Sequence, residues 1–399
     1  MQNIALDVLK GFLPKIKFEN AILKTGQIAL IKDNLKFNSI NIDYNNIPIN
    51  LSANLRNVLS KDRTLNVYFS TVLDEQAADS LINPFLTYPV KIKGQLPFKG
   101  QFRGNINDYD IDFFVSAPEQ SDISYSGANL GDVDLKREMS GKIRVLENNA
   151  SFNNLRLVKY ITQNGRTIAQ NALKINGHII LKQDGIYYNN FKIVTSTPAN
   201  VRLLNMFFKK SLLKKGDFEC NVDLNGKTTS PHTAGTLYLT NLDIPLYDTH
   251  INNIKINMSE KFIDGNILAQ NKDSDLRAFI RLNNSLQAPF IVNKLYINSN
   301  KLNVSNILKS LQTYTTKVDS EQKQEPLVAL DEIIIKDGAF NFKDVSYDKI
   351  NAQNFKGNFD FNKNILNLKN ITSQIAQGEI LAHGNYDFKT TKLNLAGTM

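Results

Sequence analysis

The stretch GKIRVLENNASFNNL, residues 141–155, contains the pattern that decides the fold of this chain. Counted from Gly141, apolar residues stand two, four, nine, eleven and fourteen places on, and Asn stands at thirteen. These residues are Ile143, Val145, Ala150, Phe152, Leu155 and Asn154. Period-two alternation on both sides of a short polar turn, Glu147 to Asn149, is typical of a β-hairpin whose apolar side chains share one face.

The same spacing recurs far away in the chain. Gly177 is followed at these offsets by Ile179, Leu181, Ile186, Tyr188, Asn190 and Phe191, and Gly357 by Phe359, Phe361, Leu366, Leu368, Asn370 and Ile371. Gly26 is followed by Ile28, Leu30, Leu35, Phe37 and Ile40, with Ser39 in the place of Asn. Weaker copies begin at Gly235 (Leu237, Leu239) and Gly338 (Phe340, Phe342), and alternation continues through Ile254, Ile256 and Ile280. Any antiparallel sheet produces some of this spacing, but repeated copies at one set of offsets favour repeated structural units.

The pattern therefore predicts an all-β dominated fold: an elongated, repetitive antiparallel β-sheet curled into an apolar groove, with a few short helices. We expect an N-terminal helical or truncated segment at 1–16 and a repeated β-hairpin groove region at 17–318. Wider apolar spacing predicts short helices near 73–86, 201–213 and 304–314. A polar linker or loop is expected at 319–326, followed by a C-terminal β region at 327–399. The helix at 201–213 carries basic residues, so it either caps the sheet with its bases in water or lies on a membrane surface.

Composition restricts the class of protein. The chain has 399 residues, of which 42% are hydrophobic and 21% charged, as in folded soluble proteins. The formal net charge of +9 comes from bases that are dispersed along the strands, which argues against nucleic acid and suits a surface beside anionic lipid. No apolar run reaches the length of a membrane-spanning helix, and no signal peptide is recognisable. We expect the chain to be a piece of a longer protein.

Motifs for chemistry are missing from the sequence. The four histidines are isolated, Cys220 is the single cysteine, and neither a nucleophile elbow nor a phosphate-binding loop is present. We therefore predict that the protein is not an enzyme and needs no metal or cofactor.

Residues 327–399 resemble the C-terminal region of the AsmA-like family. The resemblance rests on LDEIIIKDGAF at 330–340, on Phe355 to Leu368 and on QGEILAHGNYDF at 377–388, and 235–284 looks like an upstream unit of the same kind. It implies a protein of the periplasm, anchored in the inner membrane in its full-length form and related to TamB-type and bridge-like lipid-transfer proteins. The implied task is to carry phospholipid between inner and outer membranes or to support outer-membrane assembly. This chain lacks the usual N-terminal anchor of the family.

A strand with one apolar face must cover that face, and lipid acyl chains are one possible cover. The expected partners are therefore phospholipid acyl chains, and the resemblance implies the inner and outer membranes as further partners. The candidate groove lining is Ile143, Val145, Phe152, Ile179, Leu181, Tyr188, Leu237, Leu239, Ile254, Ile256, Ile280, Phe340, Phe342, Phe359, Phe361, Leu366 and Leu368. The alternative is a structural or adhesive β-sandwich or solenoid whose apolar faces pack on each other without a lipid groove.

Overall fold

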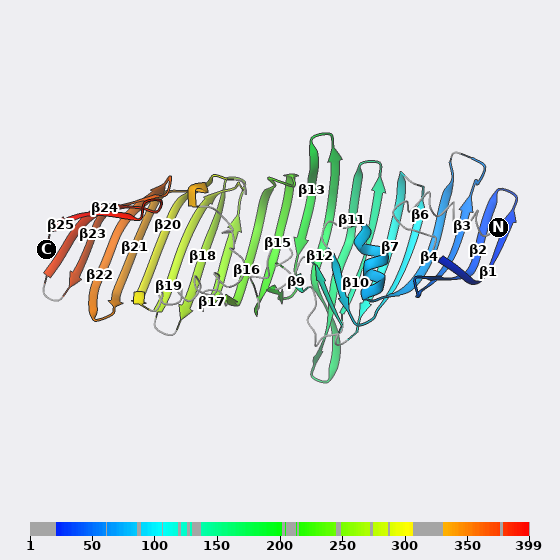
Figure 1. Ribbon diagram of the computed structural model, residues 1–399, viewed down its shortest axis with the longest axis horizontal. Helices are drawn as coiled ribbons and strands as arrows, with labels where there is room; N and C mark the ends of the chain where they lie inside the picture. Colours follow the sequence, from blue (N-terminus) through cyan, green and yellow to red (C-terminus); the bar gives the residue numbers. More distant parts are fainter. Residues whose placement is uncertain are drawn as a thin grey trace. The chain divides into compact units, whose positions relative to one another are not determined.

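A computed structural model describes residues 21–60, 62–85, 89–105, 107–118, 121–125, 128–129, 137–201, 204, 213, 215–244, 249–271, 274–285, 288–305, 330–375 and 378–398. The chain forms two compact units, residues 1–211 (unit 1) and 212–399 (unit 2), and each is described by itself. Figure 1 labels their strands where there is room. Strands make up 79% of the structure, against one short helix. The fold is therefore all-β and largely antiparallel, as predicted.

Unit 1 is built on one antiparallel sheet in which each strand pairs with the next along the chain, apart from a short insertion. Its strands are β1 (Ala21–Ile31), β2 (Asn34–Tyr44), β3 (Ile47–Arg56), β4 (Thr64–Leu73), β6 (Leu96–Gly104), β7 (Asp108–Ala117), β10 (Arg137–Leu146), β11 (Asn149–Gln163), β12 (Arg166–Lys182) and β13 (Gly185–Val194). The two-residue strand β14 (Ala199–Asn200) follows. Because successive strands alternate in direction, the turns that follow β1, β3, β6, β10 and β12 lie at one rim of the sheet. We call it the turn rim.

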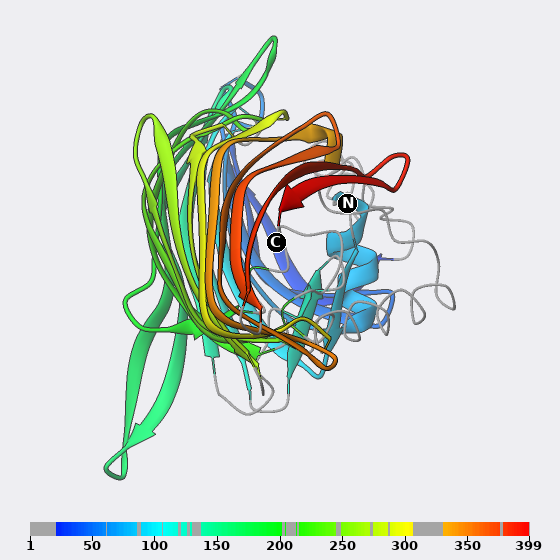
Figure 2. The ribbon, with the colours of Figure 1, turned by 90° about the vertical axis from the view of Figure 1, so that its left-hand side faces the viewer.

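The opposite rim of unit 1 carries two further features. The hairpin of β11 and β12 is longer than its neighbours, and beyond Lys159 its strands pair only with each other. It projects from the rest of unit 1, ending in the turn at Asn164 and Gly165 (Figure 2). An isolated two-stranded ribbon is only marginally stable in water, so its base in the sheet supports it.

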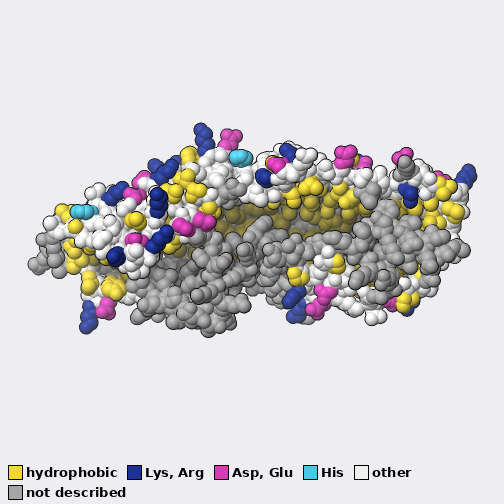
Figure 3. Space-filling model, turned by 45° about the horizontal axis from the view of Figure 1, so that its top comes forward, with side chains coloured by type: hydrophobic (Ala, Val, Ile, Leu, Met, Phe, Trp, Pro, Cys, Tyr) yellow, Lys and Arg dark blue, Asp and Glu magenta, His cyan; other side chains and the backbone are white. Residues whose placement is uncertain are grey.

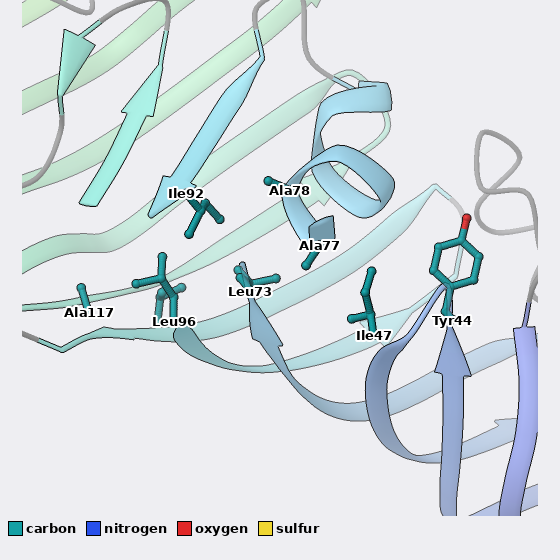
Figure 4. Packing of buried hydrophobic residues seen from close by; sticks show 9 residues of the cluster. Tyr44, Ile47, Leu73, Ala77, Ala78, Ile92, Leu96 and Ala117 are labelled. Atoms are coloured by element: carbon teal, nitrogen blue, oxygen red, sulfur yellow. The ribbon is translucent and has the colours of Figure 1, made fainter. Parts of the chain in front are cut away.

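A small cap is the second feature of that rim. It contains α2 (Glu75–Ala77), the π-helical turn η2 (Ala78–Ile82), the 3-10 turn η3 (Asn83–Phe85) and a separate sheet of β5 (Val90–Lys93), β8 (Asp122–Tyr125) and β9 (Ala128–Asn129). Asp74 caps the helical turn by accepting a hydrogen bond from the Ala77 backbone nitrogen at 2.9 Å. Ala77, Ala78 and Ile92 pack with Ile47 and Leu96 of the main sheet (Figure 4). The predicted helix at 73–86 falls on this cap.

Unit 2 is constructed in the same way, from strands that pair with their neighbours. Its strands are β15 (Lys215–Lys227), β16 (His232–Ile244), β17 (Thr249–Met258), β18 (Phe262–Asn271), β19 (Ser274–Asn283), β20 (Phe290–Asn303), β21 (Ile333–Tyr347), β22 (Ile350–Asn362), β23 (Ile365–Ile375), β24 (Gly378–Asp387) and β25 (Lys392–Thr398). The 3-10 turn η6 (Leu330–Glu332) precedes β21. Neighbouring strands are antiparallel except β20 and β21, which pair in parallel. A parallel pair needs a long connection, and the chain between Asn303 and Ile333 provides it.

The predicted curling into a groove is wrong in degree, because in neither unit is the sheet closed or strongly curled. Closing a sheet requires the first and last strands to pair with a fixed stagger. In both units the described strands instead pair from neighbour to neighbour and leave an open sheet with two faces. Alternation in the sequence specifies which side chains share a face, but it does not specify how far the sheet bends.

A β-bulge explains the repeat of Gly with Asn thirteen places later. Asn154, Asn190 and Asn370 and the equivalent Ser39 all have positive φ, between 48° and 53°. In each copy the strand register shifts at this point, so that the Asn or Ser and the following apolar residue together oppose one Gly. The extra residue turns the apolar side chain at offset fourteen back to the face used by offsets nine and eleven. The repeat is thus a bulge that keeps one face apolar.

The glycine in this bulge has no room for a side chain. A Cβ on Gly177 would lie 2.4 Å from the Phe191 Cα and 2.4 Å from the Asn190 backbone oxygen, at a φ of 128°. We expect Gly177→Ala to lower the free energy of unfolding by about 2 kcal/mol or more, measured by urea denaturation. Gly165→Ala is the control, because nothing lies within 4 Å of that Cβ, so only its φ of 73° opposes alanine. Equal losses in the two variants would contradict the steric explanation.

Several predicted segments lie outside the described residues. These are the N-terminal segment 1–16, most of the helices predicted at 201–213 and 304–314, and the linker 319–326. The boundary between the two compact units falls after residue 211, a position that the sequence reading does not single out. The C-terminal region predicted at 327–399 contains β21 to β25 and belongs to unit 2.

Candidate functional site

The candidate residues of unit 1 share one face of its sheet. Paired residues of adjacent strands project to the same side. Ile143 pairs with Phe152, and Ile179 pairs with Tyr188. Ala150, which pairs with Val145, also pairs with Ile179, so the two hairpins present the same face. Leu181 follows two places after Ile179 and lies on that face too.

This face continues through the strands that precede β10. Ile143 pairs with Ile111, which pairs with Phe102, and the register carries the face through β4 and β3 to β2. We call it the apolar face of unit 1: Phe37, Leu51, Phe69, Phe102, Ile111, Ile143, Val145, Phe152, Ile179, Leu181 and Tyr188. Phe69 and Phe102 were not among the sequence candidates, although period-two alternation in 64–73 and 96–104 is a signal that identifies them.

The candidates of unit 2 likewise share one face of their own sheet. Leu237 pairs with Ile256, and Leu239 pairs with Ile254. Gly265 pairs with both Ile256 and Ile280. Leu295 pairs with Ile280 on one side and with Gly338 of the parallel strand on the other. Further along, the registers connect Phe340, Phe342, Phe359, Phe361, Leu366 and Leu368. The apolar face of unit 2 is therefore Leu237, Leu239, Ile254, Ile256, Ile280, Leu295, Phe340, Phe342, Phe359, Phe361, Leu366 and Leu368.

Most of these side chains are only half-buried. Leu239 and Phe361 are buried, at 6% and 5% exposure, whereas Leu181 is 55% exposed. Hydrophobic side chains gather in a hollowed part of the surface in Figure 3. Among the described residues of unit 2, the substantial contacts between elements are those of adjacent strands. A face of this kind resembles one half of a core, because the contacts described for its side chains are with the strands beside them.

Phenylalanine rings dominate part of the face of unit 2. The Phe340 ring centroid lies 5.0 Å from that of Phe355 and 5.4 Å from that of Phe342, with near-parallel planes. Glycines make room for the rings, since a Cβ on Gly338 would lie 2.5 Å from the Phe359 ring and one on Gly357 would lie 2.8 Å from the Phe340 ring. Aromatic residues that cover cross-strand glycines hold the strand register and keep the surface continuous.

Tyr188 is the one candidate whose side chain ends in a polar group. Its ring packs against Phe191 with centroids 5.0 Å apart. Burial raises the pKa of the Tyr188 hydroxyl, because the phenolate would lose its water. The group therefore stays neutral at physiological pH and adds no charge to the apolar face.

The opposite face of unit 1 is polar and ion-paired across strands. Arg103 binds Asp112 at 2.7 Å and Arg144 binds Asp108 at 3.1 Å. Exposed pairs of this kind contribute little stability each, but they keep the face in water. The sheet is consequently two-sided, with charge on one face and apolar side chains on the other.

Unit 2 has the same division of its two faces. Arg281 donates two hydrogen bonds to the Asp264 carboxylate, at 2.7 and 2.8 Å. These bonds hold the pKa of Asp264 below its ordinary value of 3.8. Asp360 on the same face accepts from Asn367 at 2.6 Å and pairs with Lys369.

The lowered pKa of Asp264 has a measurable consequence. A carboxyl whose pKa is depressed by folding stabilises the fold above its unfolded pKa, and this contribution is lost as pH falls through the folded pKa. We expect Asp264→Asn to lose less stability than the parent on acidification below about pH 4, with the free energy of unfolding measured against pH. Glu379→Gln is the control, since no ion-pair partner of Glu379 is found among the described residues. If Asp264→Asn loses as much stability as the parent below about pH 4, the prediction is contradicted.

Among the residues that the structure describes, no three or more His, Cys, Asp or Glu side chains group as they would to hold a metal ion. No described helix has the length and apolar character needed to cross a membrane. Cys220 is buried on β15, opposite Leu237. The two apolar faces therefore offer contact area to an apolar ligand.

Comparison of the chain with models of protein families, with curated proteins and with solved structures finds no match.

Proposed function

We propose that the apolar faces of the two units bind phospholipid acyl chains. One observation carries this proposal: the strand registers place apolar side chains on one face of each sheet, strand after strand, with ion pairs on the other face. Soluble proteins rarely leave large contiguous apolar surface in water. Acyl chains make no directional bonds, so a continuous apolar surface is sufficient to hold them.

The resemblance to AsmA-like proteins extends the proposal to a biological task. On this proposal the full-length protein is anchored in the inner membrane and lies in the periplasm. It carries phospholipid between inner and outer membranes or supports outer-membrane assembly. The support is the resemblance in 327–399 together with the two-sided sheets. Because the sheet is neither closed nor strongly curled in either unit, we propose a shallow lipid-binding surface in place of a closed tube.

Mass spectrometry of lipid extracted from the purified protein tests the proposal. We expect phospholipid in stoichiometric amounts, removed by delipidation and regained from vesicles. The control is an unrelated β-protein carried through the same purification, which reports detergent and lipid carry-over. A protein that is folded, holds no lipid and takes none up would favour a structural or adhesive sheet whose apolar faces are covered by protein.

A further inference from the structure

The turn rim of unit 1 exposes large aliphatic side chains, of which only Leu181 belongs to the defined apolar face. Leu59, in the turn between β3 and β4, is 91% exposed. The exposure of the others lies between 46% and 67%: Leu30, Ile31, Leu146, Leu181 and Ile186. Leu59 lies in the turn after β3, and the others lie at the strand ends beside the turns after β1, β10 and β12. Antiparallel pairing therefore places all of them at one rim.

Hydrogen bonds hold neighbouring turns of this rim side by side. The Val58 backbone nitrogen donates to the Asp33 backbone oxygen at 3.2 Å, and the Leu59 nitrogen donates to the Asp33 carboxylate at 3.0 Å. Glu147 and Leu181 donate in the same way to the turns beside them, at 2.7 and 2.8 Å. The aliphatic tips are therefore fixed in a row, about 10 Å apart where two strands separate them.

The opposite rim of unit 1 shows how the same sheet treats apolar strand ends that have a cover. There the cap reduces the exposure of Ile47 to 2% and that of Leu96 to 1%. Strand ends of similar composition are thus buried at one rim and open at the other.

We propose that the turn rim of unit 1 docks on the surface of a phospholipid bilayer, with Leu59 and its neighbours inserted among the lipid head groups. Single aliphatic side chains on separate tips suit a bilayer, where each is buried independently, better than a protein partner, which needs a contiguous matching surface.

Arginine side chains at the rim suit contact with the phosphate groups of a membrane surface. A surface depression on the polar side of this rim is lined by Arg56, Arg103 and Arg144 among other residues, and arginine binds lipid phosphate well. Acidic residues also lie at this rim. The Asp33 carboxylate accepts from the Leu59 backbone nitrogen and Asp108 pairs with Arg144, while Asp62, Glu147 and Asp184 are exposed in the turns. Asp110 in the depression lies 3.9 Å from Lys142.

The rim is also continuous with the proposed lipid surface. Leu181 belongs to the apolar face of unit 1, and Leu30 and Ile186 project to the same side of the sheet. Ile186 pairs with Leu181, and Leu30 follows two places after Ile28, which pairs with Phe37. An acyl chain that leaves the bilayer there meets apolar side chains without crossing the polar face. This route rests on the proposed function, whereas docking itself does not.

A tryptophan reporter tests docking directly, because the chain contains no tryptophan. Leu59→Trp should shift its emission to the blue on adding vesicles of phosphatidylethanolamine with phosphatidylglycerol, and vesicles brominated in their acyl chains should quench it. Tyr68→Trp is the matched control, at a 53% exposed position on the polar face of β4, and should do neither. Ile31→Trp repeats the test should Leu59→Trp fold poorly. No shift at Leu59, or equal shifts at Leu59 and Tyr68, would overturn the proposal.

A charge variant separates docking from lipid carriage. Ile31→Glu with Leu59→Glu should weaken vesicle co-sedimentation by about tenfold or more, because two leucine-sized side chains no longer enter the bilayer. Neither residue belongs to the defined apolar face, so lipid extracted from the protein should not change. If the protein docks on vesicles but carries no lipid, the proposed function is contradicted and the docking inference is supported. If the protein carries lipid but the two charges leave vesicle binding unchanged, the docking inference is contradicted and the proposed function is supported.

Discussion

Ile256→Asp is expected to reduce the phospholipid bound by the protein about tenfold or more. Ile256 lies in the middle of the apolar face of unit 2, between Leu237 and Gly265. A carboxylate there cannot be covered by an acyl chain without losing its water, which costs several kcal/mol. Lipid extracted from the purified variant, counted per protein by mass spectrometry, gives the result, and Phe359→Glu should behave in the same way.

The adjacent residue Lys255 provides the matched control. It is exposed on the polar face, paired with Tyr238 and Asn266 in the ladder, so Lys255→Glu should keep the lipid content of the parent. Asp360 is a poorer control, because reversing its charge would remove its ion pair with Lys369 and its hydrogen bond from Asn367. If the Ile256 and Lys255 variants hold equal amounts of phospholipid, this face is not the lipid-binding surface. The Ile256 variant should remain folded, since the half-buried site lets the new carboxylate reach water.

Leu96→Ala is expected to lower the free energy of unfolding of unit 1 by about 2–5 kcal/mol. Leu96 is 1% exposed between the main sheet and the cap, where it pairs with Leu73. Its truncation leaves a cavity in the cluster that holds the cap. Urea denaturation provides the measurement, and resistance of the cap segment 75–93 to proteolysis reports whether the cap stays docked.

Leu59→Ala is the control for this prediction, because a 91% exposed leucine contributes little to folding. Its expected change is within about 0.5 kcal/mol. A loss below about 1 kcal/mol in Leu96→Ala would show that the cap is not held by this cluster.

Period-two alternation was sufficient to predict most of what defines the candidate site. Residues two apart in a strand project to the same face. Local geometry therefore places Ile143 with Val145, and Phe359 with Phe361, on one face. The Gly and Asn of the repeat were also visible in the sequence, although their role as a bulge was not. A residue such as Asn154 adopts positive φ more readily than most, but only the register shows that it opposes Gly141.

The sequence by itself determined that this protein is a β-protein with one apolar and one polar face, because side-chain alternation is a property of each strand alone. The tertiary structure alone decided which strands are neighbours, that β20 and β21 run in parallel, and that a cap covers one rim of unit 1 while the other rim stays open. It also decided that the sheets remain open. These features depend on pairing and packing between residues far apart in the chain, for which alternation within a strand holds no information.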